Sequence, residues 1–430
     1  MINQEQLIKE ITDYAETVNL ESKKATKLFR NSLVDTITNT VSVQEDGKIF
    51  VSTGDIPAMW LRDSSFQVLP YLEIAEDVPA VKDLIHGVLK QQLAYIQHDP
   101  YSNSFNKTAT GEHYNSGDET DIPVSDLVWE RKFEIDSLCT PLHLAYNLYD
   151  KTGYDAHLND EFWNTVDLII DTFVTEQNHM ESPYFFNRPD CVAQDTLSHD
   201  GRGAPVGYTG MVWSAFRPSD DACVYGYFVP GNLFIVAALR QLLPIVPEKY
   251  VELKERMHTL ISEIEAGVKE YGTMTVEETG EEIYAYEVDG LGNQLFMDDA
   301  NVPSLLSLPF LNYCEQDNPL YLTTRKYVLS DRNKYFYSGK YLAGVGSPHT
   351  PPEHVWPIAV AMEGLTVNDL AIIQEKIDTI VTTDNDTLQC HEGVHVDDPS
   401  QYTREWFSWS NMTFCQLVFH YLEQERAQKK

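Results

Sequence analysis

Apolar residues recur at helical spacing along most of this chain of 430 residues, which restricts the fold more than any single motif does. Such spacing predicts an amphipathic helix, because side chains three and four positions apart share one helix face. Strand-like alternation is confined to residues 48–52 and 282–286, which we expect to form short ribbons. The sequence therefore predicts an all-α fold of roughly a dozen helices. The expected helices are 4–18, 22–40, 64–76, 79–97, 134–151, 159–176, 221–243, 247–271, 301–314, 318–331, 356–364, 367–382 and 404–426.

Long polar or aromatic segments without helical spacing separate several of these helices, and loops of this length usually carry function. They span residues 98–128, 179–220, 272–300, 332–355 and 383–403. No Pro/Gly/Ser-rich linker or abrupt change of charge divides the chain, so we expect a single domain over residues 1–430. Helices joined as hairpins can close into a toroid whose inner helices wall a central cup. No sequence repeat shows such closure directly.

The charge of the chain excludes two classes of partner. The formal net charge is −35, from 66 acidic residues against 31 lysines and arginines. A chain of this charge repels nucleic acids and anionic membranes. A neutral substrate is compatible with it.

The cysteines and the N-terminal segment favour a cytoplasmic protein. The six cysteines include no CxxC pair, so we interpret them as reduced thiols rather than a zinc site or a disulfide scaffold. Residues 4–18 have helical spacing with acids in between, unlike a signal peptide. No apolar run approaches the roughly 20 residues that a membrane span needs.

The stretch 54–64 (GDIPAMWLRDS) places an aromatic ring, a cation and two carboxylates near the start of an expected helix. The indole of Trp60 can lie against the apolar face of a sugar ring, while Arg62, Asp55 and Asp63 can hydrogen-bond its hydroxyls. The alternative is structural, because Asp63 or Ser64 would make a good N-cap for the apolar run that follows. Arg62 would then simply pair with an acid. Both interpretations are open from these residues alone.

A second candidate site is the stretch 216–223 (FRPSDDAC), which leads into the expected helix 221–243. We expect Ser219 to cap that helix, with Asp220 and Asp221 at its start. The structural interpretation is that both acids only complement the positive helix terminus. Adjacent helical residues point about 100° apart, so one acid can serve the helix end while the other faces a cavity.

The third candidate is the loop 390–398 (CHEGVHVDD), in which Glu392 stands beside a glycine and can project from the loop. The letters HEGVH match HExxH, a zinc motif whose two histidines must share one face of a helix. Gly393, two β-branched valines and the nearby Pro399 argue against a helix here, so we expect no metal. Aromatic residues that include Trp409 follow at the start of the last expected helix.

Three further segments are rich in polar groups among aromatic residues, and each can contribute to a sugar pocket. They are 129–137 (WERKFEIDS), 297–304 (MDDANVPS) and 354–357 (HVWP). The structural alternative for Glu130 and Glu134 is a solvated helix face. For Asp298 and Asp299 it is helix capping, and tryptophan is more often a core residue than a sugar platform.

Taken together, several long motifs in this order resemble glycoside hydrolase family 125, the bacterial and fungal exo-α-1,6-mannosidases. The motifs are GDIPAMWLRDS, WERKFEIDSLC, FRPSDDAC, FMDDANVPSLLSLP and HEGVH with FSWSNMTF after it. The resemblance covers nearly the whole chain, from about residue 20 to about residue 425. It implies an (α/α)6 barrel with long active-site loops and a single-domain enzyme without a metal or other cofactor. It also implies hydrolysis of non-reducing terminal α-1,6-linked mannose from mannooligosaccharides or N-glycan fragments, with inversion.

By the same resemblance, Asp220 is the general acid and Glu392 the general base, although a shift of one position would give the acid role to Asp221. The other motifs match segments that line a terminal mannose site. They imply these substrate-binding residues: Trp60, Arg62, Asp63, Glu134, Asp136, Asp298, Asn301 and Trp409. An inverting enzyme needs a protonated acid and an ionised base that activates water, so we expect the site to raise the pKa of Asp220. Its carboxyl groups should lie about 6.5–9.5 Å apart, against about 5–5.5 Å in a retaining enzyme.

Other classes of function fit parts of the pattern. A glycan-binding protein on the same scaffold would keep the aromatic and polar residues but would not need both Asp220 and Glu392. A Mg²⁺-dependent isoprenoid cyclase also uses helices with acidic pairs, but neither pair here continues as DDxxD. A phosphorolytic enzyme would need cations to hold phosphate, and this acidic chain offers few. The sequence leaves the oligomeric state open.

Overall fold

The computed structural model describes residues 2–429 and is mostly helical, as the apolar spacing predicts. Its α-helices are α1 (Gln4–Thr17), α2 (Lys23–Asp35), α3 (Leu61–Val68), α4 (Val81–His98), α5 (Ile135–Thr152), α6 (Asp160–Gln177), α7 (Ser198–Gly201), α8 (Val229–Leu242), α9 (Val251–Tyr271), α10 (Pro319–Val328), α11 (Pro357–Leu365), α12 (Leu370–Thr382) and α13 (Ser408–Gln428). Within residues 2–429, no helix has both the length and the apolar character that crossing a bilayer demands.

The strands are two or three residues long and pair only into small antiparallel ribbons. The ribbons are β1 (Val41–Val43) with β2 (Ile49–Val51); β3 (Met59–Trp60), β4 (Ser104–Phe105) and β6 (Val128–Glu130); β5 (Glu119–Thr120) with β7 (Phe186–Asn187); β8 (Tyr227–Phe228), β11 (Glu287–Val288) and β12 (Gln294–Leu295); β9 (Thr273–Thr275) with β10 (Glu282–Tyr284); β13 (Phe336–Ser338) with β14 (Ala343–Val345); and β15 (His354–Val355), β16 (Gly393–His395) and β17 (Tyr402–Thr403). The two ribbons expected from the sequence are confirmed as β2 and β10.

The helices fall into two groups that differ in burial. α3 and α11 are buried along their whole length, α8 and α5 along most of it, and α13 over its first half. α1, α6, α9 and α12 instead bury one face and expose the other. A helix that is covered on all sides must lie inside the protein. The first five therefore form an inner layer, and the amphipathic helices cover it.

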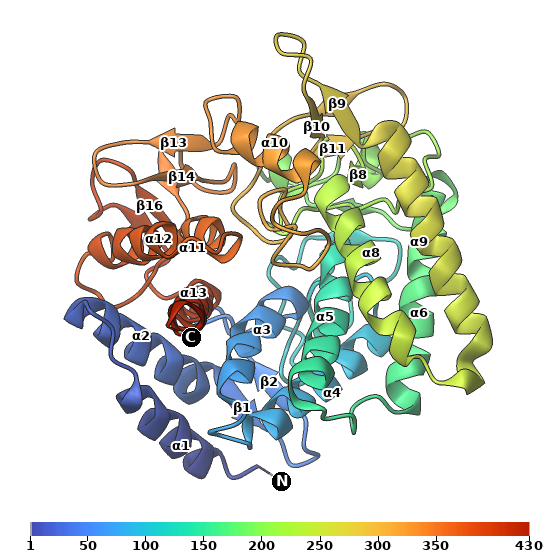
Figure 1. Cartoon of the computed structure of the whole chain (residues 1–430). Helices are drawn as coiled ribbons and strands as arrows, with labels where there is room; N and C mark the ends of the chain where they lie inside the picture. The colour runs from blue at the N-terminus through green and yellow to red at the C-terminus, as the bar shows by residue number, and fades with distance from the viewer. Residues whose placement is uncertain (1, 430) are drawn as a thin grey trace.

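The inner helices pack against one another in the order α11, α13, α3, α5 and α8. From outside, α12 packs on α11 and α13, α2 on α13, α4 on α5, and α9 on α8. Figure 1 shows the resulting arc, with α10 and the loops around it between α8 and α11. Arg325 of α10 fastens this region to the end of α11, because its guanidinium donates to the Glu363 carbonyl (2.9 Å).

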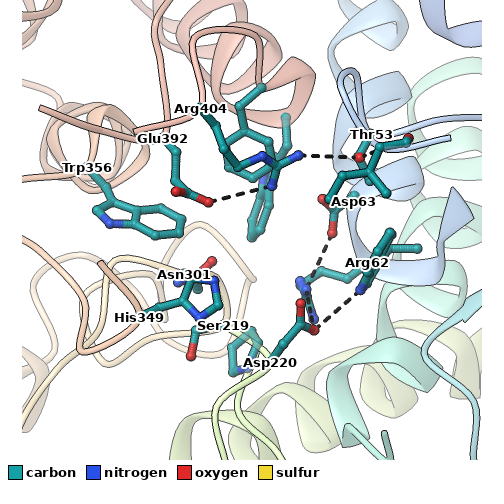
Figure 2. A pocket seen from close by; sticks show the side chains of 15 residues that line it. Thr53, Arg62, Asp63, Ser219, Asp220, Asn301, His349, Trp356, Glu392 and Arg404 are labelled. Carbon is teal, nitrogen blue, oxygen red and sulfur yellow. Dashed lines mark hydrogen bonds and ion pairs between the residues drawn. The ribbon is translucent and has the colours of Figure 1, made fainter. Parts of the chain in front are cut away.

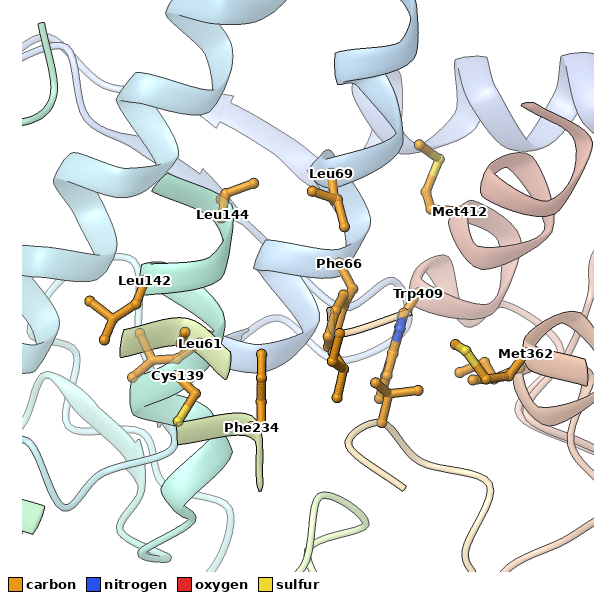
Figure 3. Packing of buried hydrophobic residues seen from close by; sticks show 14 of the residues in the cluster. Leu61, Phe66, Leu69, Cys139, Leu142, Leu144, Phe234, Met362, Trp409 and Met412 are labelled. Carbon is orange, nitrogen blue, oxygen red and sulfur yellow. The ribbon is translucent and has the colours of Figure 1, made fainter. Parts of the chain in front are cut away.

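A continuous apolar core joins the two layers, running from Leu7 in α1 to Phe419 in α13. Figure 3 shows its centre, where Phe66 of α3 lies against Trp409 of α13. The two rings are stacked, with centroids 5.5 Å apart and planes 9° from parallel. Such a contact between large buried rings fixes the two helices relative to each other.

None of the five inner helices has a side-chain N-cap. Side-chain caps occur on helices outside this layer, namely Asn3 on α1, Ser22 on α2, Asn159 on α6, Asn318 on α10 and Asp369 on α12. The cap expected from Asp63 or Ser64 is wrong, because α3 already begins at Leu61 and the Ser64 hydroxyl donates to the Trp60 carbonyl (2.6 Å). The backbone amides in the first turns of the inner helices, which carry the positive end of each helix dipole, are therefore available to groups from other segments.

One expected helix begins later than predicted and another does not form. α8 begins at Val229 rather than near residue 221, because residues 217–228 form a tight turn and strand β8. Ser219 is therefore not an N-cap. Residues 301–314 form successive turns instead of a helix. The Asp298 carboxylate ties these turns together, since it accepts hydrogen bonds from the amides of Leu305 (2.8 Å) and Leu306 (2.9 Å).

One buried ion pair holds the segment 217–225 in place. Arg217 Nε donates to Glu287 Oε1 (2.5 Å), and Glu287 Oε2 accepts from the amides of Val224 (2.8 Å) and Tyr225 (2.9 Å). Arg217 and Glu287 are both buried. This segment carries Asp220 and Asp221, so the pair fixes the place of both acids.

We predict that Glu287→Gln lowers the free energy of unfolding by about 3 kcal/mol, because it leaves the buried Arg217 without a counter-charge. Denaturant titration measures the change. The matched control is Glu265→Gln, which breaks the exposed pair with Arg240 and is expected to cost less than about 1 kcal/mol. Equal losses in the two variants would contradict a structural role for the buried pair.

Candidate active site

A cavity lies at the N-terminal ends of the inner helices, where segments far apart in the sequence meet (Figure 2). It encloses about 350 Å³ of empty space, part of which is open to solvent. Residues that precede or begin α3, α11 and α13 form much of its wall. The lining residues are Thr53, Ile56, Trp60, Arg62, Asp63, Pro218, Ser219, Asp220, Asn301, His349, Trp356, Glu392, Arg404, Phe407 and Trp409.

Asp220 reaches the cavity from a tight turn. Its φ of 67° is left-handed, a conformation that aspartate adopts more readily than most residues. The turn is closed by the Arg217 amide, which donates to the Asp221 carbonyl (2.8 Å), and Lys132 Nζ donates to the Asp220 carbonyl (2.7 Å). The carboxylate accepts hydrogen bonds from Trp60 Nε1 (3.3 Å) and from the side-chain amide of Asn103 (3.1 Å). Backbone and side-chain contacts together therefore fix the direction of this acid.

The guanidinium of Arg62 is the cation beside Asp220, with Nη2 3.7 Å from Asp220 Oδ1. Its Nη1 donates to Glu134 Oε2 (2.6 Å) and Asp136 Oδ2 (3.1 Å), and Nη2 lies 3.4 Å from Asp63 Oδ2. Asp63 lies in the first turn of α3, while Glu134 and Asp136 lie at the start of α5. Two neighbouring inner helices thus supply acids to one buried cation.

Burial and Arg62 act in opposite directions on the proton affinity of these acids. Burial dominates at Asp63 and Asp136, whose pKa values are raised to about 6, and at Glu134, whose pKa is raised well above its usual value. Burial also raises the pKa of Asp220, but a hydrogen bond with Glu134 and the charge of Arg62 together bring it below its usual value. The raised pKa expected for Asp220 is therefore wrong for the protein by itself, and the proton between these two carboxyl groups belongs to Glu134.

Glu392 enters the cavity from across the space that Asp220 faces, as Figure 2 shows. It directly precedes strand β16, and its amide donates to the Thr403 carbonyl of β17 (3.2 Å). Arg404 Nη1 lies 3.5 Å from the Glu392 carboxylate, while Nη2 of the same guanidinium donates to Asp55 (2.5 Å). Arg404 therefore connects Glu392 to the segment before α3 and restricts the direction of its carboxylate.

Asp221 does not line the cavity but pairs with a histidine that does. Its side chain is 1% exposed, and Oδ1 lies 2.9 Å from His349 Nδ1. Burial lowers the pKa of His349, but the hydrogen bond and charge of Asp221 overcome this effect and raise it to about 9. His349 is therefore a cation on the cavity wall at neutral pH. Of the two adjacent acids, Asp220 faces the cavity and Asp221 positions His349.

The structure brings most of the predicted site residues together. Asp220, Glu392, Trp60, Arg62, Asp63, Asn301 and Trp409 all line the cavity. Asp63 Oδ2 and Arg62 Nε are buried without a hydrogen-bond partner among residues 2–429, which suits them to bind a polar ligand.

Three residues predicted to bind substrate lie behind the cavity wall instead. Glu134 and Asp136 support Arg62, and Asp298 holds the backbone of the turns 301–314. The solvated helix face considered for Glu130 and Glu134 is wrong as well, because both side chains are buried. Asp298 binds backbone amides, as the capping interpretation supposed, but those amides belong to turns rather than to a helix.

Sequence reasoning missed His349 and Arg404. Each sits in a loop, and each reaches the cavity through a partner far away in the chain: Asp221 for His349 and Asp55 for Arg404. The only sequence signal for His349 is its place in the long loop 332–355, whereas Arg404 was expected to begin the helix 404–426, which in the structure begins at Ser408. Trp356, which belonged to a segment singled out for its aromatic residues, lines the cavity.

The HEGVH stretch forms a loop followed by strand β16, so its histidines do not share a helix face. The ring of His391 stacks on Tyr402 (3.9 Å) and lies between the carbonyls of Glu405 (2.9 Å) and Asp384 (3.1 Å). His395 packs edge-on against His354. Among the residues that the structure describes, no three acidic, histidine or cysteine side chains are grouped so as to hold a metal ion.

A small cavity walled by tryptophans, with a carboxyl group on each side and a cation between acids at its base, has the chemistry of a glycoside hydrolase site. Comparison with known proteins assigns the chain to a particular family. Residues 22–419 match the family described as metal-independent alpha-mannosidase (GH125). The chain belongs to this family and is an α-mannosidase.

Individual relatives agree with the family match. A metal-independent alpha mannosidase of Streptococcus pneumoniae, solved in a non-productive complex with alpha-1,6-mannobiose, is 43% identical with a TM-score of 0.93, covering 97% of this chain and 98% of that one. The meiotically up-regulated gene 157 protein of Schizosaccharomyces pombe is 34% identical, covering 94% of this chain and 84% of that protein. A bacterial glucoamylase bound to acarbose shares the fold at 15% identity, with a TM-score of 0.58 over 96% of this chain and 58% of that chain.

We predict that the His349–Asp221 pair makes the free energy of unfolding depend on pH. The folded-state pKa of His349, about 9, lies above its ordinary value of 6.5. The stabilisation is therefore complete below about pH 6.5 and is lost as the pH rises through about 9. Because the imidazole is 35% exposed, we expect about 1 kcal/mol or less. The measurement is denaturant unfolding of the wild type and of Asp221→Asn at pH 6 and pH 10. A difference between the two proteins that does not shrink at high pH would contradict the pairing.

Proposed function

We propose that this α-mannosidase removes non-reducing terminal α-1,6-linked mannose from mannooligosaccharides or N-glycan fragments, with inversion at the anomeric carbon. The observation that carries the proposal is the placement of Asp220 and Glu392 across one small cavity (Figure 2). In an inverting enzyme, one carboxyl group protonates the leaving oxygen while the other activates water on the opposite face of the sugar. The α-1,6-mannobiose complex of the 43% identical relative supports the linkage.

In the proposed mechanism, Asp220 delivers a proton to the glycosidic oxygen and Glu392 removes one from the attacking water. The indoles of Trp60 and Trp409 offer apolar faces to the pyranose. Arg62 and Asp63 have buried polar atoms available to hydroxyls of the sugar. The lining residues come from several segments that surround one cavity, and we propose that this cavity takes a single terminal residue, so that the enzyme is exo-acting.

We further propose that the inner arc is part of an (α/α)6 barrel in which the turns 301–314 occupy the position of a sixth inner helix. The arc of five inner helices and their outer partners supports this closure. The continuous apolar core from Leu7 to Phe419 supports a single domain over residues 1–430. Six free cysteines are consistent with a cytoplasmic location, which is also a proposal.

A glycan-binding protein without activity is the main rival. It would need the aromatic and polar residues that line the cavity, but it would not need two carboxyl groups that are each held in place by a cation. The anchoring of Asp220 by Lys132 and of Glu392 by Arg404 favours catalysis.

The test is incubation of the purified protein with α-1,6-, α-1,2- and α-1,3-linked mannobiose in the presence of EDTA, with the anomeric proton of released mannose followed by NMR. We expect hydrolysis of the α-1,6 disaccharide with β-mannose as the first product. Initial α-mannose would contradict the inverting roles, and no release from any disaccharide would favour the binding protein. A requirement for added phosphate would point to phosphorolysis.

Isosteric variants separate the two adjacent acids. We predict that Asp220→Asn and Glu392→Gln each lower kcat on α-1,6-mannobiose at least about 100-fold, because each removes a proton-transfer group. The matched variant is Asp221→Asn, one residue from Asp220. Because Asp221 acts only through His349, we expect it to retain clearly more activity than Asp220→Asn. A greater loss in Asp221→Asn than in Asp220→Asn would transfer the acid role to Asp221.

A further inference from the structure

Four carboxyl groups surround the guanidinium of Arg62: those of Asp63, Glu134 and Asp136 are buried, and that of Asp220 is 24% exposed. Glu134 and Asp136 accept hydrogen bonds from it, and Asp63 and Asp220 lie within 4 Å of it at 3.4 and 3.7 Å. The other cations that act on Asp220 are Lys132, which binds its carbonyl, and His349, which is occupied by Asp221. Arg62 lies on α3, Lys132 before α5, and His349 in the loop before β15.

Carboxyl groups gathered around one guanidinium resist full ionisation, because each additional carboxylate raises the proton affinity of its neighbours. At neutral pH the cluster keeps a proton on Glu134, whose pKa is raised well above its usual value by burial. The position of that proton then decides what the acid of the reaction can do. Two carboxyl groups that interact this strongly titrate as a pair rather than as independent groups.

Glu134 is the member of the cluster that shares a hydrogen-bond donor with the general acid. The side-chain amide of Asn103 lies between the two carboxyl groups, with Nδ2 3.1 Å from Asp220 Oδ1 and 3.3 Å from Glu134 Oε1. The interaction between the two carboxyl groups raises the pKa of Glu134 and lowers that of Asp220. Glu134 is 1% exposed and does not line the cavity, so it does not bind substrate directly.

We infer that Glu134 supplies the proton that Asp220 delivers, so that the acid of this site is a relay of two carboxyl groups. The inference rests on the proposed function, since it concerns the protonation of the leaving group in that reaction. It assigns to Glu134 a role in proton transfer in place of the substrate contact expected from the sequence.

Before the step Asp220 is ionised and Glu134 carries the proton. As the bond between the anomeric carbon and the glycosidic oxygen breaks, its electron pair stays on the oxygen, which takes a proton from Asp220. Asp220 receives that proton as the O–H bond of Glu134 breaks, so Asp220 is again a carboxylate after the step and Glu134 has become one. Water adds to the anomeric carbon and gives a proton to Glu392. Release of that proton to solvent and uptake of one by Glu134 restore the enzyme.

The contacts of Glu134 suit it to lose and regain a proton. Once ionised, its carboxylate still accepts hydrogen bonds from Arg62 Nη1 (2.6 Å), Ser137 Oγ (3.0 Å) and Asn103 (3.3 Å). The negative charge that forms on it during the step therefore meets a guanidinium already in place. Asp136 shares the same Nη1 at 3.1 Å, but among the described residues the Asn103 amide, which binds both Glu134 and Asp220, does not bind Asp136.

The experiment compares two substrates that differ in their need for an acid. In α-1,6-mannobiose the leaving oxygen must be protonated as the bond breaks. In α-mannosyl fluoride the leaving group is a fluoride ion, which departs without an acid. We expect Glu134→Gln, which keeps the shape but cannot release a proton, to lower kcat on mannobiose about 100-fold and on the fluoride less than about 3-fold. Glu134→Asp, which restores a carboxyl group, should recover part of the mannobiose activity.

The matched control is Asp136→Asn, which removes the neighbouring acid on the same guanidinium nitrogen. If Glu134 only held Arg62 in place, Glu134→Gln and Asp136→Asn would lower activity on both substrates alike, which would overturn the relay. Unchanged mannobiose activity in Glu134→Gln would overturn it too. Failure of the wild-type protein to hydrolyse mannobiose is a separate result, which would reject the proposed function itself.

Discussion

The cavity depends on one buried cation. Arg62 reaches the carboxyl groups of two inner helices and of the turn 217–221, and its guanidinium lies 5.6 Å from the ring centre of Trp409. A buried charge is stable only when its hydrogen bonds are nearly complete, so the acids at the starts of α3 and α5 hold those helices in register. The same cation sets the charge felt by Asp220, which connects the packing of the protein to its chemistry.

The N-terminal ends of α3, α11 and α13 line the cavity, the start of α5 lies against Arg62, and none of the inner helices has a side-chain N-cap. The partial positive charge of several helix starts favours the carboxylates gathered there. On the far side of the cavity, Arg404 lies 3.5 Å from the Glu392 carboxylate, as Arg62 lies 3.7 Å from that of Asp220. Each acid therefore has a guanidinium of its own beside it.

Helical spacing was enough to predict most of the helices, because their apolar faces are read directly from i, i+3 and i+4 neighbours. It failed at 221–228, where Glu287, an acid distant in the chain, holds the backbone. It also failed at 301–314, where the backbone is held by Asp298, which precedes the segment. The motifs supplied Asp220 and Glu392. They did not distinguish residues that face the cavity from those one layer behind, such as Glu134, since that depends on contacts across the fold.

In the proposed mechanism, one sugar lies between Asp220 and Glu392. A crystal structure of the protein with α-1,6-mannobiose whose bridging oxygen is replaced by sulfur, so that it is not cleaved, would test this placement. We expect one mannose ring in the cavity, Asp220 at the sulfur, and carboxyl groups about 6.5–9.5 Å apart with a water beside Glu392. A ring bound elsewhere, or carboxyl groups about 5–5.5 Å apart with no room for water, would contradict it.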